Sequence, residues 1–131
     1  MKILERWFDE VWNKGNEAAI DELLAPDDVI HHLLSGDGEK VTDVPSFKKM
    51  FRTFRSALSE IKVTVEHEVT EGDMSAARCS ITAVHSGDGL DRVPLKKPIH
   101  FTGMSMVRVR DGKIVESWNH FDFETMYQQM E

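Results

Sequence analysis

The sequence predicts an α+β fold, with helices in the first half of the chain and long strands in the second half. Up to about residue 58, apolar side chains recur at spacings of three and four, which is the period of an amphipathic helix. From Ile61 onward, apolar and polar residues alternate, which is the period of a half-buried strand. An antiparallel sheet with the helices packed on one face accommodates both halves.

The N-terminal segment predicts two helices. Over residues 2–14, two tryptophans and a phenylalanine fall on one helical stripe, with acidic and amide side chains opposite. Gly15 is a helix terminator, and Asn16 is a suitable N-cap for a second, shorter helix. Pro26 then ends the helical pattern, because a proline cannot continue it.

A short strand and a third helix follow. Apolar residues over 29–34 predict the strand, and the glycines at 35–38 predict a turn. Pro45 stands at a permitted first-turn position, with Asp43 or Thr42 available as N-cap. One face of the helix is then apolar: Phe47, Met50, Phe51, Phe54 and Leu58.

The second half predicts an antiparallel sheet. Asp111-Gly112 is the strongest hairpin signal in the chain, and residues 86–98 predict a long loop. A sheet this long must twist and coil, which leaves a cavity between its concave face and the helices. The predicted elements are strands at 61–69, 75–85, 99–110 and 113–121, and a last helix at 124–130.

Composition restricts the classes of function. The chain has 131 residues, which predicts a single domain over 1–131. Its net charge of −7, with the basic residues scattered, disfavours a nucleic-acid partner. The longest apolar runs are a few residues, so we expect no membrane span. Neither an HExxH nor a nucleotide-binding glycine motif is present, so we expect no metal and no cofactor.

The chain also carries signals for its compartment. Three acidic residues interrupt the first apolar segment, whereas a secretory signal needs an uninterrupted apolar stretch. The single cysteine, Cys79, cannot form an internal disulfide. Both observations favour the cytoplasm.

Several motifs carry a family resemblance. The final hairpin contains DGKIVESW, and Asp122 follows Trp118 by four residues, ahead of a glutamine-bearing terminal helix. VWNKGN near the start and DDVIHH after the second helix add support. Over nearly its whole length the chain resembles the SnoaL-like polyketide cyclase family of the NTF2-like superfamily. The resemblance implies a cone in which a curved antiparallel (mixed) sheet wraps around the N-terminal helices, and a homodimer formed by the outer sheet faces.

The resemblance also implies a catalytic residue. Asp122 resembles the acid/base residue that moves a proton for an intramolecular aldol closure, without metal or cofactor. A carboxylate in an apolar pocket suits this role, since desolvation raises its pKa toward the operating pH. Alternatively, Asp122 caps the last helix, and both roles can hold. On an ideal strand Asp122 shares a face with three residues: Ile114, Trp118 and His120.

Four further residues are candidates for substrate binding, with Trp118 among them. His31 and His32 face opposite ways on a strand, and the resemblance favours His32 for the pocket. Arg78 is able to hold a substrate carbonyl or carboxylate, or to pair with an acid within the sheet. His85 resembles the family residue at the cavity mouth. For each histidine, a structural role is the alternative.

We therefore expect a small-molecule pocket protein that performs cofactor-free acid/base cyclisation or isomerisation of a carbonyl, polyketide-like compound. The alternative is a non-catalytic module of the same fold that binds an apolar ligand or serves dimerisation. Epoxide hydrolysis is a third possibility. It needs two aspartates and an arginine around a water, of which Arg78 and Asp122 would supply two members.

Overall fold

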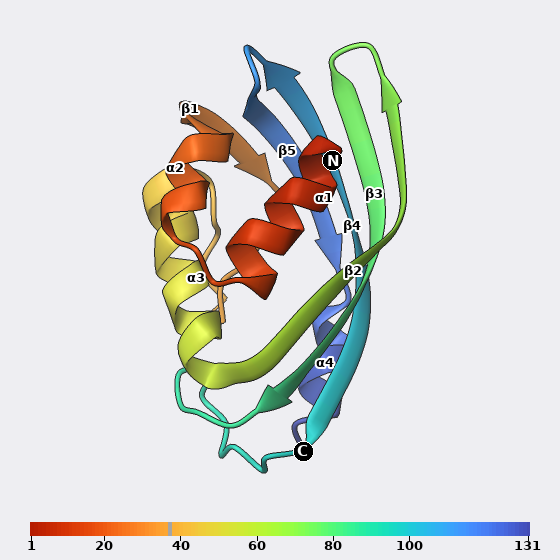
Figure 1. Ribbon diagram of the computed structural model, residues 1–131. Helices are drawn as coiled ribbons and strands as arrows, with labels where there is room; N and C mark the ends of the chain where they lie inside the picture. Colours follow the sequence, from red (N-terminus) through yellow and green to blue (C-terminus); the bar gives the residue numbers. More distant parts are fainter. Residues whose placement is uncertain (37) are drawn as a thin grey trace.

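The computed structural model describes residues 1–36 and 38–131 (Figure 1). The predicted turn at 35–38 includes Asp37, which lies outside the described residues. The elements are α1 (Ile3–Trp7), the π-helical turn η1 (Phe8–Asn13), α2 (Ala18–Leu23), β1 (Leu24–His31), α3 (Val44–Ala57), β2 (Leu58–Glu71), β3 (Met74–His85), β4 (Pro98–Arg110), β5 (Lys113–Phe121) and α4 (Phe123–Gln128). None of the described helices is both long and apolar enough to cross a bilayer.

The strands form one mixed sheet in the order β1-β5-β4-β3-β2. β1 pairs with β5 in parallel, and the other neighbours pair antiparallel. β1 begins at Leu24, five residues before the predicted strand, and includes Pro26. The proline is tolerated there because β1 lies at the sheet edge, where its missing N–H breaks no ladder on the open side.

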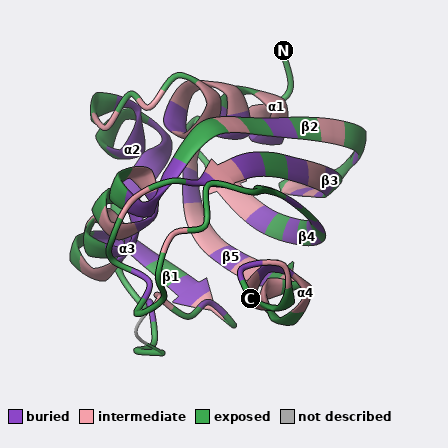
Figure 2. Ribbon diagram, turned by 90° about the horizontal axis from the view of Figure 1, so that it is seen from below, coloured by how far each residue is buried: buried purple, intermediate pink, exposed green. Residues whose placement is uncertain are grey.

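The sheet curves around the N-terminal helices. In Figure 1, α1, α2 and α3 lie on the concave side of the strands, and α4 lies beside the end of the sheet near the C-terminus. Seen from below in Figure 2, buried positions alternate with exposed or partly exposed ones along β3 and β4, as they must when one face of a strand contacts the helices. The concave face therefore meets the core, and the convex face meets solvent.

The first predicted helix is present, but its second half is π-helical. The amide of Lys14 donates to the carbonyl of Asp9 at 2.9 Å, which is the i to i+5 pattern. Gly15 then takes a φ of 66°, which ends the segment as predicted. The wider turn keeps Phe8 and Trp12 on the side that faces the sheet.

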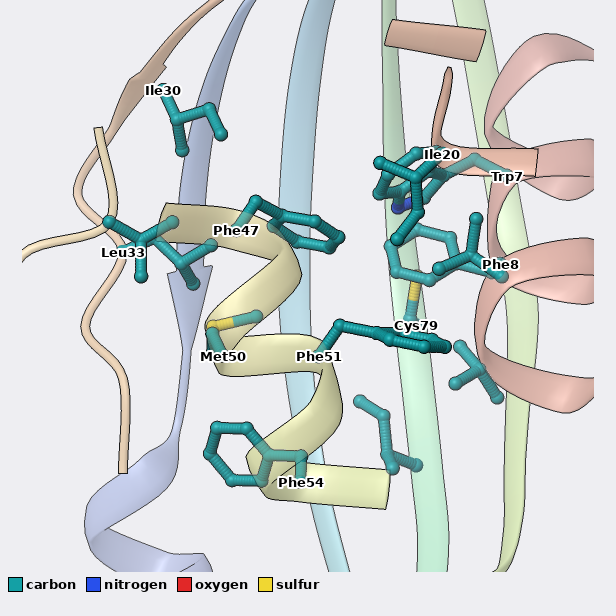
Figure 3. Close-up of a cluster of buried hydrophobic side chains, with 14 of the residues drawn as sticks. Trp7, Phe8, Ile20, Ile30, Leu33, Phe47, Met50, Phe51, Phe54 and Cys79 are labelled. Carbon is teal, nitrogen blue, oxygen red and sulfur yellow. The ribbon is translucent and has the colours of Figure 1, made fainter. Parts of the chain in front are cut away.

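Helix α3 confirms the predicted N-cap and the predicted apolar face, except that Leu58 is the first residue of β2. Asp43 is the N-cap, and its carboxylate accepts from the amide of Ser46 at 3.0 Å. In Figure 3, Phe47 and Phe51 of α3 point toward the side chains of the N-terminal helices. Ring contacts join the two groups, with centroids 5.2 Å apart for Trp7 and Phe47, and 5.3 Å apart for Trp12 and Phe51.

The inward face of β2 changes part-way along the strand. The pairing with β3 shifts register between Val65 and His67, which is a β-bulge. Beyond the bulge Glu68 turns inward, and its carboxylate accepts from the backbone amides of Leu4 and Glu5 at 3.0 Å each. Val69 is 68% exposed, so the predicted alternation is wrong after Val65.

Candidate functional site

A cavity of about 100 Å³ lies between the concave face of the sheet and the helices. Its wall is largely apolar: aliphatic side chains outnumber aromatic ones, and five of the eight aromatic side chains come from α3 and the N-terminal helices. Apart from four polar residues, the described residues that line it are apolar. The aromatic members are Trp7, Phe8, Trp12, Phe47, Phe54, Phe101, Phe121 and Phe123, and the polar members are Asp28, Ser105, Ser117 and Asn119.

A bulge in β5 decides which side chains enter this cavity. Arg108 pairs with Glu116, whereas the next residue, Val109, pairs with Ile114, so one extra residue is inserted in β5. Ile114 and Ser117 therefore both face inward, although they are three residues apart. The side chains that follow inward are Asn119 and Phe121. The prediction that Trp118, His120 and Asp122 share the face of Ile114 is wrong for this reason.

Asp28 is the carboxylic acid of the cavity wall. Asp28 is only 3% exposed, and neither of its carboxylate oxygens has a hydrogen-bond partner among the described residues. Burial, the largest cause, and the nearby charges of Asp27 and Glu116 together raise its pKa from 3.8 to about 7. His31 and the neighbouring amide of Val29 act in the opposite direction, but that amide does not reach hydrogen-bond geometry.

Asp28 does not appear among the residues predicted from the sequence. The signal that could have found it is the second aspartate of DDVIHH, because Asp28 and Ile30 share parity on a strand and both line the cavity. A predicted strand that starts at residue 29 excludes it. The strand begins at Leu24, and the inward position of Asp28 follows from that earlier start.

The other polar residues of the wall form a hydrogen-bonded chain. The Ser105 hydroxyl donates to Oδ1 of Asn119 at 2.5 Å. Nδ2 of Asn119 donates to the Ser117 hydroxyl and to the backbone carbonyl of His31, each at 3.2 Å. The chain ties β4, β5 and the end of β1 together at the polar part of the cavity.

Gly103 gives Phe121 its place in the wall. A Cβ atom on Gly103 would lie 2.1 Å from Cδ1 of the Phe121 ring, so the ring occupies the space that a side chain on β4 would need. Any larger residue at this position therefore has to move the ring and reshape the cavity.

The predicted acid/base residue, Asp122, is exposed and caps α4, which confirms the capping alternative. Its carboxylate accepts from the Thr125 hydroxyl at 2.7 Å and from the Thr125 amide at 3.1 Å. These two hydrogen bonds, the first the stronger, lower the pKa of Asp122. Asp122 does not line the apolar cavity; its proton-transfer role stays a prediction.

Arg78 and Asp122 lie close together on the convex side of the sheet, and His32 contacts their neighbour His120. Arg78 and Asp122 line a shallow hollow together with His120, and the Arg78 guanidinium pairs with Glu66 at 3.0 Å. The ring of His32 stacks on His120 with centroids 5.0 Å apart. The structure thus brings Arg78 and Asp122 together outside the cavity, and it confirms the ion-pair alternative for Arg78.

The two adjacent histidines do not face opposite ways. The strand ends at His31, and His32 takes a φ of 61°, which swings its ring to within 6.2 Å of the His31 ring. His31 stacks on Trp118 at 5.4 Å and shares a hydrogen bond of 2.9 Å with Glu116. The ring of Trp118 is therefore held on the convex side, away from the cavity wall.

His85 is enclosed where β3 ends. It is 1% exposed, and its backbone amide donates to the carbonyl of Lys97 at 3.2 Å, which holds the loop after β3 against the strand. Neither ring nitrogen of His85 meets a hydrogen-bond partner in the described part of the chain. The His85 ring does not line the apolar cavity, so its predicted substrate contact stays a prediction.

Within residues 1–36 and 38–131, no group of three or more His, Cys, Asp or Glu side chains is arranged to hold a metal ion. The polar part of the cavity has one carboxylate, two hydroxyls and one amide. These groups can accept, donate and transfer protons, and they can bind an oxygen atom of a ligand.

Comparison with models of known protein families shows the family to which the chain belongs. The model of the SnoaL-like polyketide cyclase family matches residues 2–130. The chain belongs to this family. The resemblance predicted from DGKIVESW and the flanking motifs is therefore confirmed, and the family supports a cyclase-like function. A comparison with curated proteins gives no match.

Solved structures of other SnoaL-like and related proteins share the fold. IdmH, a proposed polyketide cyclase from Streptomyces antibioticus, is 32% identical over 93% of this chain and 91% of its own, with a TM-score of 0.79. A proposed polyketide cyclase from Acidithiobacillus ferrooxidans is 25% identical over 98% and 91%, with a TM-score of 0.80. AclR, a proposed hydroxylase from Streptomyces galilaeus, is 22% identical over 92% and 77%, with a TM-score of 0.79, and shows the fold alone. The predicted α+β, NTF2-like fold is confirmed.

Proposed function

We propose that this protein is a cofactor-free acid/base catalyst that cyclises or isomerises a carbonyl compound, with Asp28 as the group that carries the proton. One observation carries the proposal: a buried carboxyl with a pKa near 7, and with no hydrogen-bond partner among the described residues, lies in the wall of a largely apolar cavity. Membership of the SnoaL-like family and likeness to the proposed cyclase IdmH support the type of reaction.

The chemistry uses both protonation states of Asp28. The ionised carboxylate takes a proton from the carbon next to a ligand carbonyl, and the electrons of that C–H bond form an enolate. The enolate carbon then attacks a second carbonyl of the same ligand, which forms a C–C bond and leaves an alkoxide. The Asp28 carboxylic acid returns its proton to that alkoxide. A pKa of about 7 suits this cycle, because both forms are populated at neutral pH.

The apolar wall contributes by excluding water and by orienting the ligand. Apolar walls strengthen the interaction between the carboxyl and the reacting atoms, and close contact holds a flexible ligand in a folded shape. The volume of about 100 Å³ is below the range of about 300–1,000 Å³ of typical ligand pockets. We therefore expect aromatic side chains to move apart when a ligand larger than a single ring enters.

A competing assignment keeps Asp122 as the acid/base residue, with His32, Arg78, His85 and Trp118 shaping the site. Its support is the family resemblance of the segment around Asp122. Against it stand the exposure of this carboxylate and its two hydrogen bonds to Thr125, both of which favour the ionised form. Asp28 and Asp122 are therefore both replaced in the deuterium-exchange experiment.

A second copy of the chain is the partner we propose for the convex face. Met104 is 53% exposed and Met106 is 40% exposed there, an arrangement that favours contact with another apolar surface. The family resemblance supports a homodimer through this face. Analytical ultracentrifugation of Met104→Glu tests it: a dimer for the wild type and a monomer for the variant support the proposal, and a monomeric wild type refutes it.

The test of the reaction follows exchange of a ligand C–H proton with deuterated solvent, which needs no knowledge of the natural substrate. Aryl methyl ketones and aryl β-keto esters are incubated with the wild type, and deuterium uptake is followed by NMR. We expect Asp28→Asn to slow protein-dependent exchange by about 100-fold or more. Asp27→Asn is the matched control, because Asp27 is the exposed neighbour of Asp28.

The rates of deuterium exchange in the two aspartate variants distinguish the three hypotheses about the site. Loss in Asp28→Asn with retention in Asp122→Asn supports the proposal. Loss only in Asp122→Asn supports the competing assignment. Ligand binding without exchange in any form of the protein supports a non-catalytic binding module.

A further inference from the structure

The hydrogen bonds in the cavity wall have a fixed direction. Nδ2 of Asn119 faces the backbone carbonyl of His31, which only accepts, so this side of the amide must be the donor side. Oδ1 consequently faces Ser105, whose hydroxyl donates to it at 2.5 Å. The second N–H of Asn119 then donates to the Ser117 hydroxyl at 3.2 Å.

With the hydrogen bonds in this direction, the hydroxyl hydrogen of Ser117 has no acceptor among the described residues. Ser117 Oγ itself accepts from Asn119. The side chain is buried and lines the apolar cavity. A buried hydroxyl that accepts inside the protein and has no acceptor for its own hydrogen is ready to donate to a ligand.

Ser117 lies on the strand next to the one that carries Asp28. β1 and β5 are parallel, with Ile30 opposite Ser117, and Asp28 is two residues before Ile30. With ordinary strand spacing and rise, the Cα atoms of Asp28 and Ser117 are about 8 Å apart. Both side chains line the cavity, so one small group of a ligand is able to contact both.

We infer that the Ser117 hydroxyl donates a hydrogen bond to the ligand carbonyl oxygen next to the carbon that Asp28 deprotonates. Asn119 acts as a positioning residue, because it occupies the acceptor side of that hydroxyl. The inference rests on the proposed function in taking the ligand to be an enolisable carbonyl compound. When the proton leaves carbon for Asp28, negative charge develops on this oxygen, and a donor already oriented in an apolar cavity stabilises it.

The experiment measures binding rather than turnover, with two probes of nearly the same size. Acetophenone has a carbonyl oxygen, and ethylbenzene lacks it. Binding to the complete chain is followed by NMR titration at about pH 6, where the Asp28 carboxyl is mostly protonated and does not repel the carbonyl. We expect Ser117→Ala to weaken acetophenone binding by about 5- to 10-fold and to change ethylbenzene binding by less than about 2-fold.

Two further variants test the assigned roles. Ser117→Thr keeps the hydroxyl and should restore most of the preference for acetophenone, whereas Asn119→Leu should reduce it by freeing the hydroxyl to turn. Ser75→Ala is the matched control, because Ser75 is a buried serine on β3 whose hydroxyl pairs with Thr70 and which does not line the cavity. We expect this control to bind both probes as the wild type does.

Three results would overturn the inference. The first is a wild type that binds acetophenone no better than ethylbenzene, including the case in which neither binds. The second is an equal loss for both probes in Ser117→Ala, which would mean that the serine only maintains the shape of the cavity. The third is a failure of Ser117→Thr to restore the preference when its fold is intact. Because binding is measured, the hydrogen bond from Ser117 to the ligand carbonyl is tested separately from the deprotonation by Asp28, which the deuterium-exchange assay tests.

Discussion

Replacing Asp28 by asparagine should change how stability depends on pH. The pKa of Asp28 is about 7 in the folded protein, against 3.8 as the ordinary value that applies when the chain is unfolded. Folding therefore takes up a proton between about pH 4 and pH 7, and the contribution of Asp28 to stability is lost as the pH rises through this window. Asparagine has nearly the same shape and does not ionise, so the variant lacks this loss.

The magnitude follows from the size of the pKa change. A rise from 3.8 to about 7 corresponds to about 4 kcal/mol, since each pKa unit is worth about 1.36 kcal/mol. Below pH 4 both side chains are neutral and buried, with no hydrogen-bond partner in the described part of the chain, so the two proteins should be equally stable. Above pH 7.5, Asp28→Asn should be the more stable protein by about 2–4 kcal/mol, the lower figure allowing for water entering the cavity.

Urea unfolding followed by tryptophan fluorescence, at several values between pH 4 and pH 9, measures this difference. Asp27→Asn is the control: it removes one of the charges that raise the Asp28 pKa but leaves the burial that is the larger cause, so the loss of stability with rising pH should persist, with its midpoint moved to lower pH. A variant that is less stable than the wild type at pH 8, or a difference that does not depend on pH, would refute the reasoning about Asp28.

Three further changes have defined outcomes in the same unfolding assay. Glu68→Ala removes the carboxylate that accepts hydrogen bonds from two backbone amides at the start of α1, and it should lower the free energy of unfolding by about 1–2 kcal/mol. Glu71→Ala changes an exposed residue of the same strand and should lower it by less than about 0.5 kcal/mol. Equal losses in the two variants would contradict the capping role of Glu68. Gly103→Ala should lower the free energy of unfolding by about 1–3 kcal/mol, because the added Cβ meets the ring of Phe121. Adding Phe121→Leu to this variant should restore part of the lost stability. An unchanged stability in Gly103→Ala would refute the contact. His85→Leu should leave stability unchanged or raise it by about 1 kcal/mol, because neither ring nitrogen has a partner among the described residues; a large loss of ligand affinity would instead support the predicted substrate contact.

The helices and strands could largely be predicted from the sequence, because their signals are local. The period of apolar residues separates the helical half from the sheet, and Gly15 and Asp43 mark helix ends through their own backbone and side-chain chemistry. The parallel pairing of β1 with β5 has no such signal. It joins residues more than 80 positions apart in the chain, so that only the folded sheet defines it.

The site could not be predicted as well, since a single inserted residue reverses the face of everything after it. The bulge between Ile114 and Glu116 turns Ser117 inward and Trp118 outward, whereas counting by twos from Ile114 predicts the opposite. A similar shift after Val65 turns Glu68 inward. Bulges depend on cross-strand pairing and on what packs against each face, which the period of the sequence does not record.

The proposed function depends on a carboxyl group in the cavity that gives and takes a proton near neutral pH. The most direct test is a carbon-13 NMR titration of the Asp28 carboxyl carbon in the intact protein, with the signal assigned by its absence in Asp28→Asn. A titration midpoint near pH 7 is the predicted result. A midpoint near 3.8, the ordinary value for an aspartate, would contradict the proposal and leave the cavity without its acid/base group.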